Sequence, residues 1–401
     1  GLQGAVAGVN ITIPTGEVGS DPLIKIRGQV GSISGNNTPL ILLDNVEIPS
    51  IQMVNPNDVQ SISVLKDAAS SSIYGSKAAF GVILITTKSG AQSDKFEISY
   101  SNNFSWQDPA KKIEIGGIEA LQYTLDAQTN RREPMPAGGF WRISPESLEK
   151  AIEWQNLYGG KVKWNDPVVY GRDWFYDGKD KYGYRLYDGA KAMIKNWTPT
   201  MTHNLSVNGK SGKTSYNIGL GYLDQSGMSK TAKKDDFKRY NASVSVTSEI
   251  NKYITVRASS IYSDRNKRYP GIGNTTADPW LYLYRWSPLM PMGVTENGNP
   301  LKEPTYEMAA ANTDNLQNKY YNINLGFTLN LTKNWDVKFD YTYDRQTTET
   351  NSSVMQYEAG EMWYAPTAWM ENGSQVFVNE QGERVDTGGM PAYRFPVNKY
   401  Y

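Results

Sequence analysis

A strict two-residue alternation of apolar and polar side chains recurs along this 401-residue chain after residue 90. In the segment 335–344, every odd residue from Trp335 to Tyr343 is apolar or aromatic, and every even residue is polar. A period of two predicts β-strands that have one apolar face and one polar face. Seven segments follow this pattern: 96–106, 201–208, 214–223, 238–249, 252–263, 321–331 and 335–344.

The connections between these segments alternate between short and long. Short turns fall at 209–213, 250–251 and 332–334, whereas long loops fall at about 107–200, 225–237, 264–318 and 351–401. This sorting is typical of an outer-membrane β-barrel, whose periplasmic turns are short and whose external loops are long. A tilted strand of about ten residues crosses the hydrocarbon layer, so no apolar run of about 20 residues is needed. Barrels that enclose a plugged lumen have about 22 strands, so we expect these seven to be part of a larger antiparallel transmembrane barrel that continues beyond this chain.

Charge and composition exclude several other classes of protein. Lys plus Arg and Asp plus Glu both number 41, so the net charge is zero and no basic footprint for nucleic acid stands out. The chain has no cysteine and one histidine, His203, which alternates with Met201 and Leu205 and is expected to be structural on the apolar face. We therefore expect no catalytic residue, no metal site, no cofactor and no enzymatic activity.

Residues 1–90 have a different pattern and predict a small α+β domain. Short apolar strands are expected at 24–27, 40–43, 61–65 and 82–86, separated by turns rich in Gly, Asn and Pro. Asp67 is a suitable N-cap for a short helix that ends near Gly75.

An ordered set of motifs in this region resembles the plug domain of the SusC/RagA family of TonB-linked outer-membrane transporters. The motifs are residues 2–9, 24–28, 39–44, 55–59, 64–68, 73–79 and 81–88. Residues 91–401 resemble the N-terminal part of that family's barrel in their pattern and in the segment 279–288. The chain departs from the family at Asn45, where the family usually has Gly, and at Phe80, where it often has Asn. Asn tolerates a left-handed backbone, so the turn at residue 45 is expected to survive.

The resemblance implies a function and a set of partners. It implies energised import of an oligosaccharide across the outer membrane of a Bacteroidetes-type bacterium, with outer-membrane lipid around the barrel. A SusD-like surface lipoprotein is implied as the lid, and TonB is implied to pull on the plug through an N-terminal segment that is missing here. Pairs of transporter and lid are implied to form dimers in some members. Oligopeptide import by the same type of transporter stays open, as does a secreted carbohydrate-binding β-protein or adhesin.

Candidate substrate contacts lie in two places. The loop 28–37 is expected at the apex of the plug, where Ser34, Asn36 and Asn37 would face substrate, although a plain polar turn is the alternative. Trp280, Tyr282 and Trp286 lie in one long loop, and aromatic rings of this kind stack on sugar rings. The alternative is that these rings pack the loops against each other or against a partner protein.

Strand parity predicts which face meets the membrane. Leu325, Phe327, Val337, Phe339 and Tyr341 are expected to contact lipid. Asn324, Lys338 and Asp340 are expected to face the lumen or the plug.

Overall fold

The computed structural model describes most of the chain. The described residues are 9–12, 17–26, 38–88, 96–109, 113–131, 143–176, 181–271, 286–296, 298, 300–332, 334–353, 359–361, 368–371, 374–378 and 384–385. Within them, no helix is long and apolar enough to cross a membrane.

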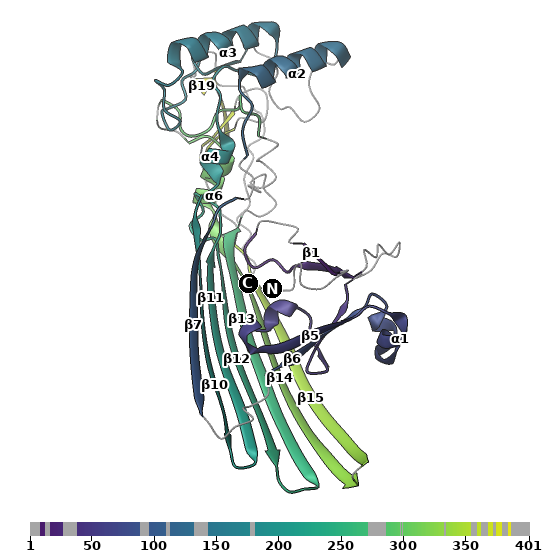
Figure 1. Cartoon of the computed structure of the whole chain (residues 1–401). Helices are drawn as coiled ribbons and strands as arrows, with labels where there is room; N and C mark the ends of the chain where they lie inside the picture. The colour runs from purple at the N-terminus through teal and green to yellow at the C-terminus, as the bar shows by residue number, and fades with distance from the viewer. Residues whose placement is uncertain are drawn as a thin grey trace.

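The N-terminal domain consists of a hairpin and a small mixed sheet (Figure 1). The antiparallel hairpin pairs β1 (Val9–Thr12) with β2 (Leu23–Ile26). The four-stranded sheet has the order β4-β3-β6-β5, with β3 and β6 parallel. Its strands are β3 (Leu40–Leu43), β4 (Val46–Glu47), β5 (Val59–Leu65) and β6 (Val82–Thr87). One α-helix and three 3-10 helices connect them: α1 (Ala68–Ser71), η1 (Ile51–Met53), η2 (Pro56–Asp58) and η3 (Ser72–Ala78).

A tight turn between β3 and β4 accommodates the departure from the family at Asn45. Asp44 and Asn45 both have left-handed backbones, with φ of 48° and 70°. Asn and Asp tolerate this conformation because their short side chains bond locally. The Asp44 carboxylate accepts hydrogen bonds from the amide and hydroxyl of Thr87, at 2.9 and 2.6 Å, and so ties the turn to β6.

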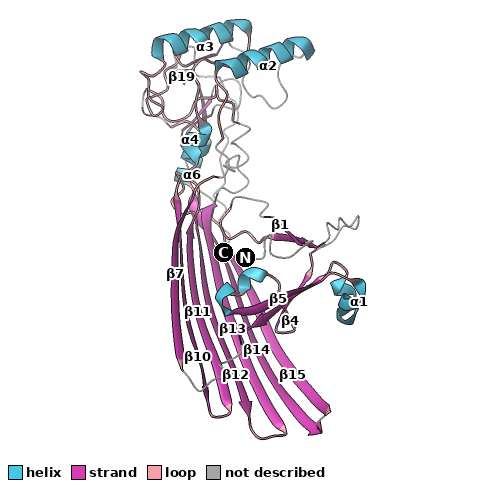
Figure 2. Ribbon diagram, viewed as in Figure 1, coloured by secondary structure: helices cyan, strands magenta, loops and turns pink. Residues whose placement is uncertain are grey.

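The second unit is a curved antiparallel sheet of seven long strands in the order β15-β14-β13-β12-β11-β10-β7 (Figure 2). Its strands are β7 (Glu97–Gln107), β10 (Thr198–Ser211), β11 (Thr214–Ser226), β12 (Asp236–Glu249), β13 (Ile254–Gly271), β14 (Asn312–Thr332) and β15 (Trp335–Asn351). All seven expected strands are present, and the short turns join them at one end of the sheet. Several strands run beyond the predicted bounds at the loop end, where the alternation gives way to polar residues on both faces.

The outer face of the sheet carries an apolar band bounded by a belt of tyrosines. Tyr222 pairs with Tyr240, and Tyr262 pairs with Tyr321, across neighbouring strands. From Tyr321 to Leu331 the strand makes ten residue steps. At about 3.4 Å per residue and a tilt of about 40°, this corresponds to a height of roughly 26 Å, close to the ~25 Å apolar band of outer-membrane barrels. The residues predicted to face lipid lie in this band and are all exposed, among them Leu325 and Phe339 at 50% and 53%.

A compact cap of loops and helices lies beyond the loop ends of the strands (Figure 1). We use the term cap for the described residues within 113–196 and 286–311. It contains α2 (Ile118–Arg131), α3 (Pro145–Tyr158), β8 (Trp174–Tyr176), β9 (Lys181–Gly183), α4 (Gly189–Met193) and α6 (Pro304–Ala310). The helix expected from Ser144 is confirmed as α3. Ser144 accepts the Ser147 amide at 3.1 Å and Ser147 reciprocates, which makes a capping box. Further along the chain, β16 (Gly360–Glu361), β17 (Ala368–Glu371), β18 (Ser374–Val378) and β19 (Arg384–Val385) form a small antiparallel sheet.

Candidate functional site at the plug, the wall and the cap

The N-terminal domain is fastened to the inner face of the sheet by side chains of β12. Asn241 donates to the carbonyl of Met53 at 2.8 Å, and Arg239 donates to the carbonyl of Gln52 at 2.9 Å. These contacts come from odd positions of β12, the face opposite to Tyr240. The polar residues of the alternating pattern in β12 therefore face the N-terminal domain.

Two glycines of β11 let this domain approach closely. A Cβ at Gly219 would lie 2.3 Å from a carboxylate oxygen of Asp58, and one at Gly221 would lie 2.7 Å from the amide nitrogen of Asn55. Asp58 accepts a hydrogen bond from Ser243 at 2.6 Å. Burial raises the pKa of the Asp58 carboxyl, and the Ser243 bond and the charge of Lys88 offset only part of that rise.

Charged side chains of β13 hold a second part of the N-terminal domain. Arg265 is 7% exposed and pairs with Asp21 at 3.1 Å, and Lys267 pairs with Glu17 at 2.7 Å. Tyr320 of β14, 1% exposed, packs into the apolar core of the N-terminal domain. Three adjacent strands, β12 to β14, therefore carry most of the described contacts.

The contact of Asn55 and Asp58 with the sheet was not predicted from the sequence. A signal was present, because glycine at alternate positions of a strand marks a close approach of another chain segment. Gly219 and Gly221 both fall on the inner register of β11.

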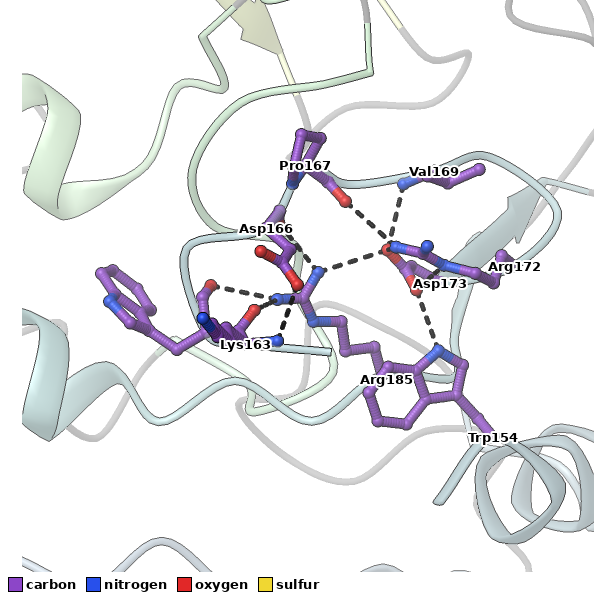
Figure 3. Close-up of polar contacts among 9 residues, drawn as sticks. Trp154, Lys163, Asp166, Pro167, Val169, Arg172, Asp173 and Arg185 are labelled. Carbon is purple, nitrogen blue, oxygen red and sulfur yellow. Dashed lines mark hydrogen bonds and ion pairs between the residues drawn. The ribbon is translucent and has the colours of Figure 1, made fainter. Parts of the chain in front are cut away.

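The cap is organised around a buried carboxylate, Asp173 (Figure 3). Asp173 is fully buried and accepts the indole N–H of Trp154 at 2.9 Å and the amide of Val169 at 3.0 Å. The Arg172 guanidinium donates twice to it, at 2.8 Å each. Burial would raise the pKa of the Asp173 carboxyl, but the hydrogen bonds from Arg172, Val169 and Trp154 outweigh it and hold the pKa below its usual value.

Arg185 completes this network from the adjoining segment. It is 2% exposed and lies 3.3 Å from Asp173. Its remaining donors reach the carbonyls of Lys163, Trp164 and Asp166 at 2.7, 3.0 and 3.1 Å (Figure 3). A buried guanidinium with four acceptors fixes the loop shape, so we interpret this network as structural.

The predicted substrate contacts can be placed only in part. Ser34, Asn36, Asn37, Trp280 and Tyr282 lie outside the described residues. Trp286 is 7% exposed, donates to the carbonyl of Met290 at 3.3 Å and belongs to the apolar core of the cap. This position agrees with the alternative that loop rings pack against each other, and a role in substrate binding stays a prediction.

The single histidine lies on the outer face, as expected. His203 Nδ1 is 2.8 Å from the Tyr100 hydroxyl, and its ring stacks on Tyr222 at a centroid distance of 6.2 Å. Among the described residues, no group of three or more His, Cys, Asp or Glu side chains is arranged to hold a metal ion.

Comparison with known proteins agrees with this architecture. Residues 1–82 match the family model of the TonB-dependent receptor plug domain. TonB-dependent receptor P26 of Formosa agariphila is 28% identical over 328 residues, which cover 80% of this chain and 29% of that protein. TonB-dependent receptor SusC of Bacteroides thetaiotaomicron is 27% identical over 254 residues, which cover 61% of this chain and 20% of that protein.

A solved structure, that of the RagAB peptide transporter, has the same fold. It is 26% identical, with a TM-score of 0.63, and the match covers 88% of this chain and 39% of that one. The chain therefore spans less than half the length of each of these proteins.

A plug domain held against the inner face of an antiparallel membrane wall defines a TonB-dependent receptor. The plug-domain match, the SusC relative and the RagAB structure together support a SusC-like receptor of the bacterial outer membrane.

Proposed function

We propose that the chain is the plug and first part of the wall of an importer that takes up oligosaccharides across the outer membrane. The observation that carries this proposal is the plug domain docked on the polar inner face of the sheet. Energy would come from TonB, acting on the plug domain. A SusD-like lipoprotein would cover the external side, where the cap lies. We propose no catalysed reaction.

The inner face of β7, β10 and β11 supports a saccharide as the cargo. Side chains there carry hydroxyl or amide groups and no charge over most of the strand length: Ser99, Ser101, Asn103, Ser105, Thr200, Thr202, Asn204, Ser206 and Asn217. Hydroxyl and amide groups both donate and accept hydrogen bonds, as sugar hydroxyls do. The plug domain touches this part of the wall closely at Gly219 and Gly221 and reaches Ser101 through Asn57 at 3.5 Å. Its buried hydrogen bonds and ion pairs are made with β12 and β13. We therefore place the path of the cargo along the rest of the inner face of β7 and β10.

A matched pair of substitutions on β7 tests the path. Asn103 pairs with Thr202 on the inner face, whereas Asn102 pairs with His203 on the outer face, and both are exposed. Asn103→Tyr is expected to reduce energy-dependent uptake of a labelled oligosaccharide by intact cells. Asn102→Tyr places the same ring outside the lumen and is expected to leave uptake unchanged. Equal uptake by both variants would contradict a path along β7.

An oligopeptide is the second candidate cargo, and it is favoured by the structural similarity to the RagAB peptide transporter. Cells that lack the gene and are complemented with the full-length protein should recover uptake of the true cargo only. Labelled oligosaccharides and oligopeptides of equal length can be compared directly, with a protonophore as the control for energy coupling. Protonophore-sensitive recovery for peptides alone would replace the saccharide proposal.

A secreted carbohydrate-binding protein or adhesin was the third alternative. The plug-domain match and the outer-membrane relatives argue against it.

A further inference from the structure

A pocket with a basic lining lies at the base of the cap, next to α4. Its volume is about 550 Å³ and its polar lining consists of Asp188, Lys191, Lys195, Asn196 and Lys230. Ligand sites in proteins are commonly concave regions of about 300–1,000 Å³. The pocket is separate from the plug contacts of β12 to β14 and from the network around Asp173.

The main chain fixes the spacing of the three lysines. The amide of Lys195 donates to the carbonyl of Met228 at 2.7 Å, and the amide of Lys230 donates to the carbonyl of Met193 at 2.8 Å. The Lys230 ammonium also donates to the carbonyl of Lys191 at 3.0 Å. Met193 is 1% exposed, so α4 is anchored in the cap beneath the pocket. The lysines therefore belong to one hydrogen-bonded unit and not to independent loops.

Positive charge is in excess at this place, although the whole chain has no net charge. Three ammonium groups line the pocket against one carboxylate, that of Asp188. The Asp188 carboxylate is already used, because it accepts the amide of Lys191 at 2.9 Å as the N-cap of α4. Asp235 lies near Lys195, and its carboxylate accepts the amide of Ser229 at 2.8 Å. Even with Asp235 counted, positive charges outnumber negative ones.

An exposed tryptophan follows the pocket lining directly. Trp197 comes after Asn196 in the chain and is 67% exposed. Its φ is 58°, in the left-handed region that a bulky residue rarely adopts. Such conformations persist where the surrounding structure enforces them, and they concentrate at functional sites. Here the strained backbone holds an exposed indole ring at the residue that follows Asn196 of the pocket lining.

The apolar part of the pocket also suits a sugar. The rest of the lining is apolar and offers surface to the C–H groups of a pyranose ring: Pro109, Ile113, Ala190 and Ile194. Lysine ammonium groups and the Asn196 amide can donate hydrogen bonds to carboxylate, sulfate or hydroxyl oxygens. A neutral sugar would leave the excess positive charge of the pocket uncompensated.

We propose that this pocket binds an acidic saccharide unit, one that carries a carboxylate or sulfate group, and that the cargo is therefore an anionic oligosaccharide. The proposal deepens the function proposed above and rests on it for the identity of the cargo as a saccharide. Lys191, Lys195 and Lys230 bind the anionic group, and Trp197 stacks on a neighbouring ring of the chain.

Calorimetry on the full-length receptor in detergent tests the proposal with two trisaccharides of equal length, trigalacturonate and its neutral galactose counterpart. An exposed lysine contributes about two- to fivefold in affinity. Trigalacturonate is therefore expected to bind roughly tenfold or more tightly than the neutral trimer, with the difference shrinking at high salt. The triple variant Lys191→Gln, Lys195→Gln, Lys230→Gln is expected to abolish this preference.

A charge-matched control separates the pocket from general electrostatics. Three other lysines of the cap lie outside the pocket lining: Lys150, Lys161 and Lys163. Their replacement by Gln removes an equal number of positive charges. This control is expected to retain the preference for trigalacturonate. Trp197→Ala is expected to weaken binding of both trimers by about two- to tenfold. Equal loss in the two triple variants would overturn the assignment to this pocket.

Membrane lipids also carry anionic groups, and a second experiment distinguishes the two sources. Vesicles that contain lipid A phosphates are titrated with the same variants. Lysine-dependent binding of these vesicles, without binding of trigalacturonate, would refute an acidic cargo. If neutral oligosaccharides are imported and no lysine-dependent binding of trigalacturonate is found, the inference fails while the proposed function stands. If trigalacturonate binds through the lysines but no oligosaccharide is imported, the pocket stands and the proposed function fails.

Discussion

Replacing Arg185 by methionine probes how strongly the cap depends on its buried ion network. Methionine keeps much of the side-chain volume but removes the positive charge of Arg185. It also removes the hydrogen bonds that Arg185 donates to Asp173 and to three backbone carbonyls. Arg185 is only 2% exposed, so water does not replace these partners. Removing one partner of a buried ion pair typically costs about 3–5 kcal/mol. We expect a loss in that range for the cap.

Arg172 provides the matched comparison, because it donates to the same carboxylate from a more exposed position. Its side chain is 27% exposed, and its removal leaves Asp173 with Arg185, Trp154 and the amide of Val169. We expect Arg172→Met to cost about 1–2 kcal/mol, since hydrogen bonds to charged groups contribute about 1.5–3 kcal/mol before solvent screening.

Hydrogen exchange on the full-length protein is the suitable assay, because unfolding of a membrane barrel does not report on the cap. The amide of Tyr184 donates to the carbonyl of Asp173 at 2.9 Å and serves as the probe. Arg185→Met should accelerate exchange there by about two to four orders of magnitude, and Arg172→Met by about five- to thirtyfold. Equal acceleration in both variants would refute the argument that burial decides the cost.

Three further predictions concern the membrane face, the cap and the plug contact. Phe327→Arg on the outer face should destabilise the barrel by about 2–4 kcal/mol in lipid-folding assays, whereas Asn324→Arg on the inner face should cost much less; the reverse order would invert the face assignment. Glu303 is 1% exposed, and burial raises the pKa of its carboxyl from 4.5 to about 7. Because of the raised pKa, the folded cap binds the proton more tightly than the unfolded cap does. The free energy of opening of the cap, measured by hydrogen exchange, should therefore increase by up to about 3 kcal/mol as the pH falls from 8 to 5. Glu303→Gln should remove that dependence, and an unchanged pH profile in this variant would contradict it. Gly219→Val should displace Asp58 from the wall and increase protease access to the plug, and unchanged proteolysis would show that the close approach is not needed.

The strands of the wall were predictable because their signal is local. In β15, for example, odd and even positions from Trp335 to Tyr343 separate cleanly into two faces, and the sequence shows this directly. The turn at Asn45 was predictable for a similar reason, since a left-handed backbone depends mainly on the residue itself.

The contacts between distant segments were not predictable. Arg185 is buried beside Asp173 only because three separate parts of the cap fold together, and nothing in its neighbours distinguishes it from an exposed arginine. The same holds for Trp286, which lies in the apolar core of the cap. The loop sequence around it is equally compatible with an exposed position. The lysines of the pocket come from two segments that are distant in the sequence and are joined by the pairing of Ile194 with Ser229.

The way the plug domain is held bears on how it would be released during import. The contacts to β12 are hydrogen bonds from Arg239 and Asn241 to backbone carbonyls, and the contacts to β13 include ion pairs with the partly exposed Asp21 and Glu17. A neutral hydrogen bond contributes about 0.5–1.5 kcal/mol net and one to a charged group about 1.5–3 kcal/mol, because water replaces the partner after separation. Apolar contacts from Tyr320 of β14 and Ile261 of β13 add to these polar bonds. An interface built in this way holds a defined position at rest and separates step by step under a pull, since no single contact carries most of the energy. A dry apolar interface of the same area would resist such a pull until it failed as a whole. We therefore expect the polar inner register of β12 and β13 to matter for release of the plug as much as for its docking.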